Sequence, residues 1–436
     1  RVAGSQYNID TVLGNDASAT DKLIVNGNTS GATTLSVTNV GGTGAQTVEG
    51  IQVVQVDGTS DGSFTLAAPV QAGSYEYTLQ KNGVSTPTDG DWYLRSTFIA
   101  TCANTPSLCP VTEPPVRVYR PAVAMYVTAQ SANADAGFLQ LSTLHQRMSE
   151  QRALSTDKAQ TWGRLFTTSQ SNNGQNRFDY DQHTTGFQFG HDLRHTTDEQ
   201  GKQQRAGLTV QYAHSNIDSK DTIRPLLGLG KDSGSTSATS VGIGGYFTQI
   251  AKDGAYIDIV SQVNHLTNKF SDSYGLKSKQ HGWQIGLSGE IGKPVAQVKD
   301  WHIEPQAQLS YLYSRYSGFS DLYSNIAGVN AHNLRARLGL RVYKDVVIDN
   351  KDAQYYGIVN IHHDLLKPKT ITLYDRTGTG QASVSERFDR TSWEVGAGIQ
   401  GQVGKNTYLY ADARYERSFK GNKEAGQINL GVKASF

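Results

Sequence analysis

The residues best suited to chemistry in this chain are one serine run, two histidine pairs and one cysteine pair. Ser233 and Ser235 lie in an Asp-Ser-Gly-Ser run of the kind that surrounds a nucleophilic serine. No histidine precedes His145, so residues 1–144 hold no histidine base for such a nucleophile. The run also stands in a stretch rich in serine and glycine. We therefore interpret it as part of a loop between strands and expect no catalytic residue and no enzyme.

The two histidine pairs raise the question of a metal site. His191 and His195 would share one face of a helix, but the pattern around them is that of a strand end and a turn. His362 and His363 are adjacent in a predicted strand, so their side chains would point to opposite faces. We expect solvated side chains at both pairs, and neither a metal ion nor a cofactor.

Cys102 and Cys109 lie in a connector, residues 100–121, that also holds four prolines before its last residue. Two cysteines with six residues between them could close a small disulfide in an oxidising compartment. A metal is disfavoured because no further ligand cluster lies nearby.

Charge and hydropathy exclude several classes of protein. The 436 residues carry 40 basic and 39 acidic side chains, a formal net charge of +1, so we expect no nucleic-acid partner. No stretch approaches the ~18 consecutive apolar residues that a transmembrane helix needs. A β-barrel remains open, because its strands alternate and are not apolar on average. The residues that follow Arg1 do not have the charged and then apolar pattern of a signal peptide. We expect the sequence to start within a longer protein.

The strongest pattern runs from residue 162 to residue 436, where apolar and polar side chains alternate with a period of two. In residues 334–342 one face is Leu, Ala, Leu, Leu and Val, and the other carries three arginines and a glycine. The same alternation recurs at 283–290, 393–400 and 408–416. We count twelve such segments, which start near Thr161, Asp181, Gln203, Thr236, Gly254, Lys279, Trp301, Ala331, Gln354, Phe388, Lys405 and Ala425.

The segments have the length of membrane-crossing strands. Each runs roughly 11 to 16 residues, longer than the usual globular strand of about 5 or 6. Connections after even-numbered segments are short, as at 251–253, and those after odd-numbered ones are generally longer, notably 217–235 and 368–387. Unpaired backbone groups are costly in hydrocarbon, so such strands must close on themselves. We predict an all-β fold, a 12-stranded antiparallel transmembrane barrel. A large soluble all-β protein is the alternative, with shorter strands expected.

The polar faces of these strands would line a lumen. A barrel of roughly twelve strands has an interior wide enough for one helix and too narrow for a folded domain. We expect the following charged side chains to face that lumen: Glu290, Glu304, Arg335, Arg337, Arg341, Glu394, Asp412, Arg414, Glu416 and Lys433.

One segment, residues 133–158, has the periodicity of a helix. Its apolar stripe is Phe138, Leu141, Leu144 and Met148, and the rest is polar and includes Arg147 and Arg152. If wholly helical it would span roughly 39 Å, about the thickness of a bilayer with its headgroups. The segment could lie on a domain surface. Its place directly before the first strand, and polar flanks that suit the lumen charges, favour a helix threaded through the pore.

The N-terminal 100 residues differ in composition, with short β-type runs separated by turns such as Asn26-Gly27-Asn28. The end of a β-helix and a β-sandwich both fit this pattern. The predicted organisation is therefore a β-rich region at 1–100, a linker with prolines and cysteines at 101–132, a pore helix at 133–160 and a barrel at 161–436.

Several motifs together resemble the C-terminal translocation unit of the type Va autotransporters. They are the junction Val118-Tyr119-Arg120-Pro121-Ala122-Val123, the helix run Leu141 to Met148, the barrel opening Trp162-Gly163-Arg164 with 178–181 and 185–190, and the terminal Phe436. Residues 1–100, ending in Gly90-Asp91-Trp92-Tyr93-Leu94, resemble the last rungs and autochaperone-like cap of a pertactin-like passenger. Asn133, the one asparagine in 131–160, would lie at the helix start, so we expect no self-cleavage inside the barrel.

The resemblance implies self-export across the bacterial outer membrane, with the passenger displayed at the cell surface and the helix left in the pore. The barrel assembly machinery would read the last strand, Ile428, Leu430, Val432, Ala434 and Phe436, with periplasmic chaperones as further partners and a monomeric barrel as the product. An adhesin or virulence-type passenger is a family-level expectation. The rival hypothesis is an outer-membrane channel or barrel enzyme with a periplasmic N-terminal domain.

Overall fold

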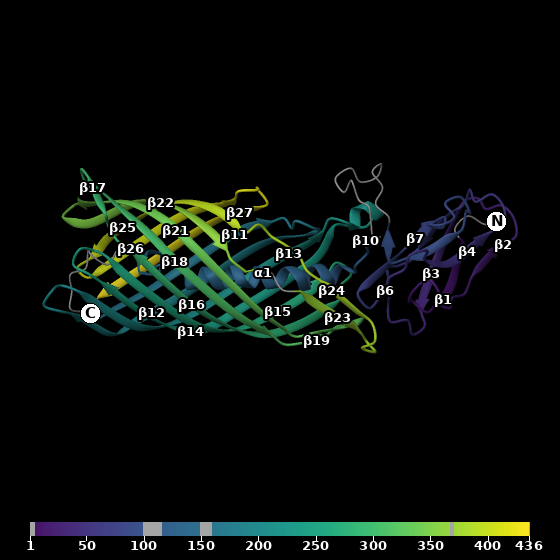
Figure 1. Ribbon diagram of the computed structural model, residues 1–436, viewed down its shortest axis with the longest axis horizontal. Coiled ribbons are helices and arrows are strands. Elements are labelled where there is room, and N and C mark those ends of the chain that lie inside the picture. Colours follow the sequence, from purple (N-terminus) through teal and green to yellow (C-terminus); the bar gives the residue numbers. More distant parts are fainter. Residues whose placement is uncertain (1–4, 99–115, 149–158, 367–369, 436) are drawn as a thin grey trace.

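The computed structural model describes residues 5–98, 116–148, 159–366 and 370–435 (Figure 1). A small β-domain at the N-terminal end and a barrel follow one another along its long axis, and a helix lies inside the barrel. The twelve barrel strands are β11 (Gln160–Asn172), β12 (Phe178–Thr197), β13 (Gln203–Asp221), β14 (Asp232–Ile250), β15 (Tyr256–Asp272), β16 (Lys277–Gly292), β18 (Trp301–Tyr316), β21 (Val329–Ile348), β22 (Lys351–Asp364), β25 (Thr391–Gly404), β26 (Thr407–Ser418) and β27 (Lys423–Ser435).

The barrel closes because its first and last strands pair. Gln160 of β11 lies opposite Ser435 of β27, and the antiparallel register continues to Asn172 opposite Lys423. β16 also pairs with β18, so within the described residues the strands form one ring. The predicted closed antiparallel barrel is confirmed. Its strands, of 12 to 20 residues, are longer than the pattern indicated.

The alternation places apolar side chains outside and polar side chains inside. In β21 the side chain of Leu338 is 67% exposed and that of Arg337 is 3% exposed, although the two are neighbours in the chain. An apolar side chain that is exposed on the outside of a barrel wall can face lipid, which shields it from water. The inside of the same wall is buried under the helix.

The two rims of the barrel differ. At one rim the turns are short, such as 349–350 and 405–406. At the other, which we call the passenger rim, the connections include 222–231, 317–328 and 365–390. The predicted loop at 217–235 is wrong in extent, because β13 runs to residue 221 and β14 starts at residue 232. The Asp-Ser-Gly-Ser run therefore lies in a strand, where ladder pairing fixes it.

The N-terminal domain is the end of a β-helix rather than a sandwich. β1 (Ser5–Thr11), β3 (Ala32–Asn39) and β5 (Ser63–Leu66) pair in parallel, as do β2 (Leu23–Val25) and β4 (Ile51–Val56). Antiparallel strands then close the stack: β6 (Val70–Ala72), β7 (Tyr75–Lys81) and β8 (Trp92–Arg95). We call this domain, residues 5–98, the cap. β9 (Thr97–Phe98) pairs with β10 (Val116–Arg117), which leads into the helix.

The helix begins earlier than predicted and is broken. α1 spans Pro121–Leu141 and α2 spans Leu144–Met148, so the predicted linker at 101–132 and the continuous helix at 133–160 are both wrong in their bounds. Pro121 suits the first turn of a helix, where no intrahelical hydrogen bond to its nitrogen is needed. Ser142 has φ of 47° and ψ of −176°, a conformation outside the helical region that ends α1. At about 1.5 Å per residue, α1 is roughly 31 Å long.

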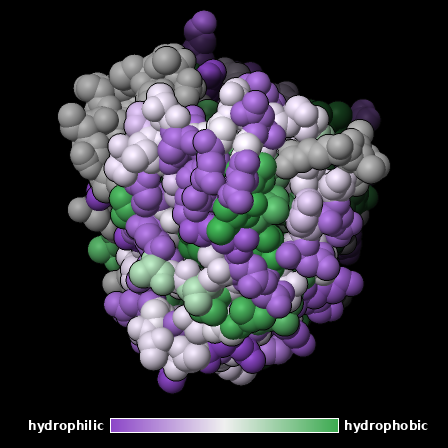
Figure 2. Space-filling model, turned by 90° about the vertical axis from the view of Figure 1, so that its right-hand side faces the viewer, coloured by the Kyte–Doolittle hydropathy of each residue, from purple (hydrophilic) through white to green (hydrophobic). Residues whose placement is uncertain are grey.

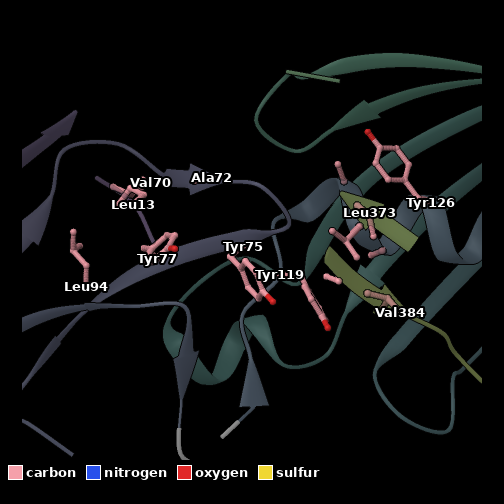
Figure 3. Close-up of a cluster of buried hydrophobic side chains, with 14 of the residues drawn as sticks. Leu13, Val70, Ala72, Tyr75, Tyr77, Leu94, Tyr119, Tyr126, Leu373 and Val384 are labelled. Atoms are coloured by element: carbon pink, nitrogen blue, oxygen red, sulfur yellow. The ribbon is translucent and has the colours of Figure 1, made fainter. Parts of the chain in front are cut away.

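A single buried cluster joins the cap to the barrel. It runs from Leu13 and Tyr77 in the cap, through Tyr75 and Tyr119, to Tyr126 of α1 (Figure 3). On the barrel side it takes in Leu373 of β23 (Ile371–Asp375) and Val384 of β24 (Gln381–Val384), a hairpin in the 365–390 connection. The end of the molecule that carries the cap presents a mixed surface with many hydrophilic residues (Figure 2). None of the described helices is both long enough and apolar enough to cross a membrane.

Candidate functional site: the occupied barrel lumen

Small side chains let α1 fit inside the barrel. The helix is buried along its length and carries six alanines and one glycine among its 21 residues. A Cβ atom at Gly137 would lie 2.3 Å from Oε1 of Gln284 on β16, so the helix approaches the wall closely there. α1 contacts β12 to β16 and β18. An amphipathic period is absent, since no residue of α1 is exposed to solvent.

The wall donates hydrogen bonds to the backbone of the helix. Gln262 Nε2 donates to the carbonyl of Gly137 at 3.2 Å, and Arg164 Nη2 donates to that of Leu139 at 2.8 Å. Beyond the break, Gln308 Nε2 donates to the carbonyl of Ser142 at 2.7 Å. Carbonyls near a helix end lack intrahelical partners, so these contacts satisfy groups that water would otherwise have to reach.

A layer of buried ion pairs surrounds α2. Arg147 Nη2 lies 2.8 Å from Oδ1 of Asp258, and both side chains are buried. His145 Nε2 lies 3.0 Å from Oε1 of Glu304. The amide nitrogen of Leu144 donates to Oε2 of Glu290 at 3.0 Å. These contacts hold α2 to strands β15, β16 and β18, and a movement of the turn would separate the buried charges of Arg147 and Asp258.

The apolar stripe of the predicted helix contacts the wall as well. Leu141, Leu144 and Met148 belong to a buried cluster with Trp162 and Tyr246, among others, and Phe138 packs against it. Arg152 lies outside the described residues.

The predicted lumen charges lie inside the barrel and most occur in pairs or networks. Arg335 Nη2 is 3.0 Å from Oδ1 of Asp135 on α1, and Arg335 Nε is 2.6 Å from Oδ1 of Asp364. The remaining contacts are Arg337 with Glu290, Arg341 with Glu304, Arg414 with both Glu394 and Asp412, Glu416 with Lys423, and Lys433 over the Tyr408 ring. A cavity of about 100 Å³ remains between the helix and this wall, lined by charged and amide side chains that suit water.

Sequence reasoning missed several partners. Asp258, Asp192 and Arg205 are buried lumen residues of the alternating segments, and the strand period alone could have identified them. Asp135 was missed because the predicted helix was judged by its apolar stripe. Arg120 was missed because its partner lies about 200 residues away.

A further ion pair joins the cap to the passenger rim. Arg224 Nη1 lies 2.5 Å from Oε2 of Glu76 in β7, and the hydroxyl of Tyr274 donates to the other oxygen of Glu76 at 2.8 Å. Burial, with the Glu76 carboxylate as the second cause, raises the pKa of Tyr274 to about 12. The phenol is thus a neutral donor at physiological pH, and three side chains from cap and rim form one network.

The predicted assembly signal lies on the outer face of β27. Ile428, Leu430 and Val432 are 51%, 50% and 41% exposed, and Ala434 is half-buried. Phe436 lies outside the described residues, as do Cys102 and Cys109. Among the described residues, no group of three or more His, Cys, Asp and Glu side chains could hold a metal ion.

Comparison with known proteins identifies the family. Residues 161–414 match the family described as autotransporter beta-domain, and residues 2–79 match autochaperone domain type 1. The chain belongs to the autotransporter family. It is therefore an outer-membrane translocation unit, in which the barrel crosses the membrane and a passenger lies at the cell surface.

Relatives of this autotransporter include adhesins. The chain is 32% identical to the adhesin BmaC autotransporter of Brucella suis biovar 1 (strain 1330) over 98% of its own length and 13% of that protein. It is 27% identical to the pertactin autotransporter of Bordetella bronchiseptica (strain ATCC BAA-588 / NCTC 13252 / RB50), over 93% of this chain and 45% of the relative. The transport unit of the autotransporter AIDA-I from Escherichia coli has the same fold, with a TM-score of 0.54 at 16% identity, covering 73% of this chain and all of that one.

Proposed function

We propose that α1 and α2 are the stalled end of an exported passenger and close the pore once export ends. One observation carries this proposal: the chain passes from β10, which pairs with β9 of the cap, into Pro121, and α1 and α2 lie in the lumen before the chain enters the wall at β11. The lumen ion pairs with Asp135 and Arg147 then hold the helix in place. The cap is a folded domain wider than one helix, so it does not fit through the lumen and keeps the passenger outside.

Single-channel recording tests the closure. The intact chain should conduct weakly, and deletion of residues 121–158 should raise the conductance severalfold, because a helix of about 10 Å diameter leaves the lumen. Deletion of the cap alone, residues 5–98, is the matched control and should leave the conductance low. Equal large conductance in the intact and the helix-deleted chains would contradict the closure.

The passenger that this unit exports is proposed to act in adhesion, with no enzymatic activity in the present chain. The support is the name of the Brucella relative. Cells that display the full passenger should bind a host-cell surface or each other, and cells that carry only residues 1–436 should not.

Assembly is proposed to need the outer-membrane barrel machinery and periplasmic chaperones, and to give a monomer. The exposed row of apolar residues on β27 supports recognition of the last strand. A disulfide between Cys102 and Cys109 is proposed from spacing alone, and a thiol-labelling assay under denaturing conditions tests it.

A tag-accessibility experiment separates this function from the rival, a channel with a periplasmic N-terminal domain. A protease site placed in the exposed turn at 26–28 of the cap should be cut in intact cells. The same site placed in the short turn at 252–254 should be cut only after the outer membrane is opened. The rival predicts the reverse pattern.

A further inference from the structure

A cavity of about 570 Å³ lies at the passenger rim, on the outside of the barrel wall. Its lining comes from three connections and two strand ends: Gln175, Arg387 to Arg390, Phe419 and Lys420, with His363 and Thr391. His363 and Thr391 are cross-strand partners on β22 and β25, on the face opposite to the lumen residues His362 and Ser392. These two residues therefore place their part of the lining on the membrane side of the wall.

The cavity carries an excess of positive charge. Arg387, Arg390 and Lys420 are exposed, and within the part of the chain that the structure describes none of the three has an ion pair. Arg390 donates through Nε and Nη2 to the carbonyls of Asp364 and Leu365, at 2.7 Å each. The lumen arginines nearby, in contrast, are paired with carboxylates.

The one acidic side chain of the lining is already occupied. Asp389 accepts hydrogen bonds from Gln175 Nε2 at 3.0 Å, Ser418 Oγ at 2.7 Å and Asn422 Nδ2 at 3.3 Å. These contacts tie the 387–390 segment to two neighbouring connections. Phe388 adds an edge-to-face contact with Tyr180, with ring centroids 5.1 Å apart. The cations are thus carried on a backbone that is fixed before any ligand arrives.

Apolar side chains continue from the cavity down the outer wall. Directly below the His363–Thr391 pair, Ile361 lies opposite Trp393, and below them Val359 lies opposite Val395. Ile361, Val359 and Val395 are each more than 40% exposed, and Phe419 at the cavity is 62% exposed. A molecule that fits both parts has an anionic head and apolar chains.

We propose that this cavity binds the phosphorylated headgroup of a glycolipid in the outer leaflet, with Arg387, Arg390 and Lys420 on its phosphates and its acyl chains along Ile361, Trp393 and Val395. The assignment to the outer leaflet rests on the proposed export function, which places the passenger rim outside. Binding measured in detergent does not depend on that orientation. Loss of surface display with lipid binding intact would therefore count against the export function alone.

The test uses the purified full chain in detergent and bisphosphorylated lipid A as the probe, with affinity read by native mass spectrometry. Replacing all three cations, Arg387→Gln, Arg390→Gln and Lys420→Gln, should weaken binding by at least about tenfold, since each basic group near a lipid surface adds to the affinity for anionic headgroups. The matched control removes three exposed lysines at the opposite rim, Lys252→Gln, Lys299→Gln and Lys405→Gln, and should retain the affinity. Equal weakening by both triple variants would overturn the site.

Two further arms keep the test decisive. Because Arg390 also holds two carbonyls, the double variant Arg387→Gln with Lys420→Gln leaves those contacts intact and should still weaken binding by about fivefold or more. Heat-modifiable gel migration checks that each variant is folded. Lipid A without phosphates should bind at least about tenfold more weakly, in keeping with the charged contacts. Displacement of lipid A by excess inorganic phosphate would show a small-anion site and overturn the lipid assignment.

Discussion

Arg120 and Asp321 form a fully buried ion pair, with Nη2 and Oδ2 2.5 Å apart. Arg120 directly precedes α1, and Asp321 lies between β19 (Phe319–Ser320) and β20 (Ser324–Ile326) in a passenger-rim connection. The hydroxyl of Tyr126 donates to the same carboxylate oxygen at 2.7 Å. The point at which the chain enters the barrel is thus fixed to the rim by charge as well as by packing.

Removing the carboxylate should loosen this entry point. Asp321→Ala leaves the Arg120 guanidinium and the Tyr126 hydroxyl buried without their partner, which costs about 3–5 kcal/mol when a buried pair is broken. Hydrogen exchange of the amides at 118–126 should accelerate by about two orders of magnitude, because opening there becomes correspondingly easier. Asp300→Ala breaks the exposed pair with Lys344 and is the control, with an expected effect of at most about 1 kcal/mol. Similar exchange in both variants would contradict the role given to Asp321.

A larger side chain at Gly137 should displace the helix in steps that follow its size. Alanine should be tolerated, because the atoms within 3 Å of its Cβ belong to the end of the flexible Gln284 side chain. Gly137→Trp cannot be accommodated in the same way, since the ring would have to enter the wall. Single-channel conductance should stay low in Gly137→Ala and rise in Gly137→Trp, and a low, unchanged conductance in Gly137→Trp would show that the fit is loose.

Recognition of the last strand can be separated from the cost of placing a charge in lipid. Leu430 on β27 and Leu338 on β21 both face outward, at 50% and 67% exposure. Arginine at either position should cost about 2–4 kcal/mol if it lies near the bilayer midplane. Only Leu430→Arg also alters the proposed assembly signal. The amount of folded barrel in cells should therefore fall further in Leu430→Arg than in Leu338→Arg, and equal loss would argue that lipid cost alone decides.

The turn at Asp89 should make the cap sensitive to acid. Burial would raise the pKa of Asp89, but hydrogen bonds from Thr86 and Tyr93, with backbone amides, outweigh it and hold that pKa below its usual value. Because the folded-state pKa is lowered, the stabilisation is present above the unfolded pKa of about 3.9 and is lost as pH falls through the folded value. Exchange of the amides near 83 and 91 should therefore accelerate below about pH 4.

The variant Asp89→Ala provides the comparison for that pH profile. Exchange at the same two amides should already be fast at neutral pH and should change less on acidification, since the titrating group is gone. A steep acid transition in Asp89→Ala would assign the effect to another carboxyl group.

The strand period was enough to predict the barrel, because each lipid-facing position must be apolar and each lumen position polar at every second residue. Leu338 and Arg337 show this rule in two consecutive residues. Closure followed from the cost of unpaired backbone groups, and the pairing of β11 with β27 confirms it. The strand number followed from the count of alternating segments, and the twelve barrel strands confirm it.

The helix could not be placed by the same method. Amphipathic periodicity arises when one face meets a core and the other meets water, and no residue of α1 is exposed to water. Its N-terminal half has no apolar stripe, so the predicted start of the helix, residue 133, lies twelve residues after the observed start, residue 121. The proline at 121 was the available signal for its start. Pairs such as Arg120 with Asp321 depend on a fold that brings distant segments together, and no local pattern encodes them.

The ion pairs at the passenger rim determine how the molecule would bear a mechanical load. A pull on the displayed passenger reaches Glu76 and Arg120 first, where Arg224 and Asp321 pass it to the strands on either side of their connections. Those strands are hydrogen-bonded around a closed ring, so tension spreads over the circumference before it stretches the threaded segment. A pull on the exposed domain would thus be borne by the barrel wall before it drew α1 out of the lumen.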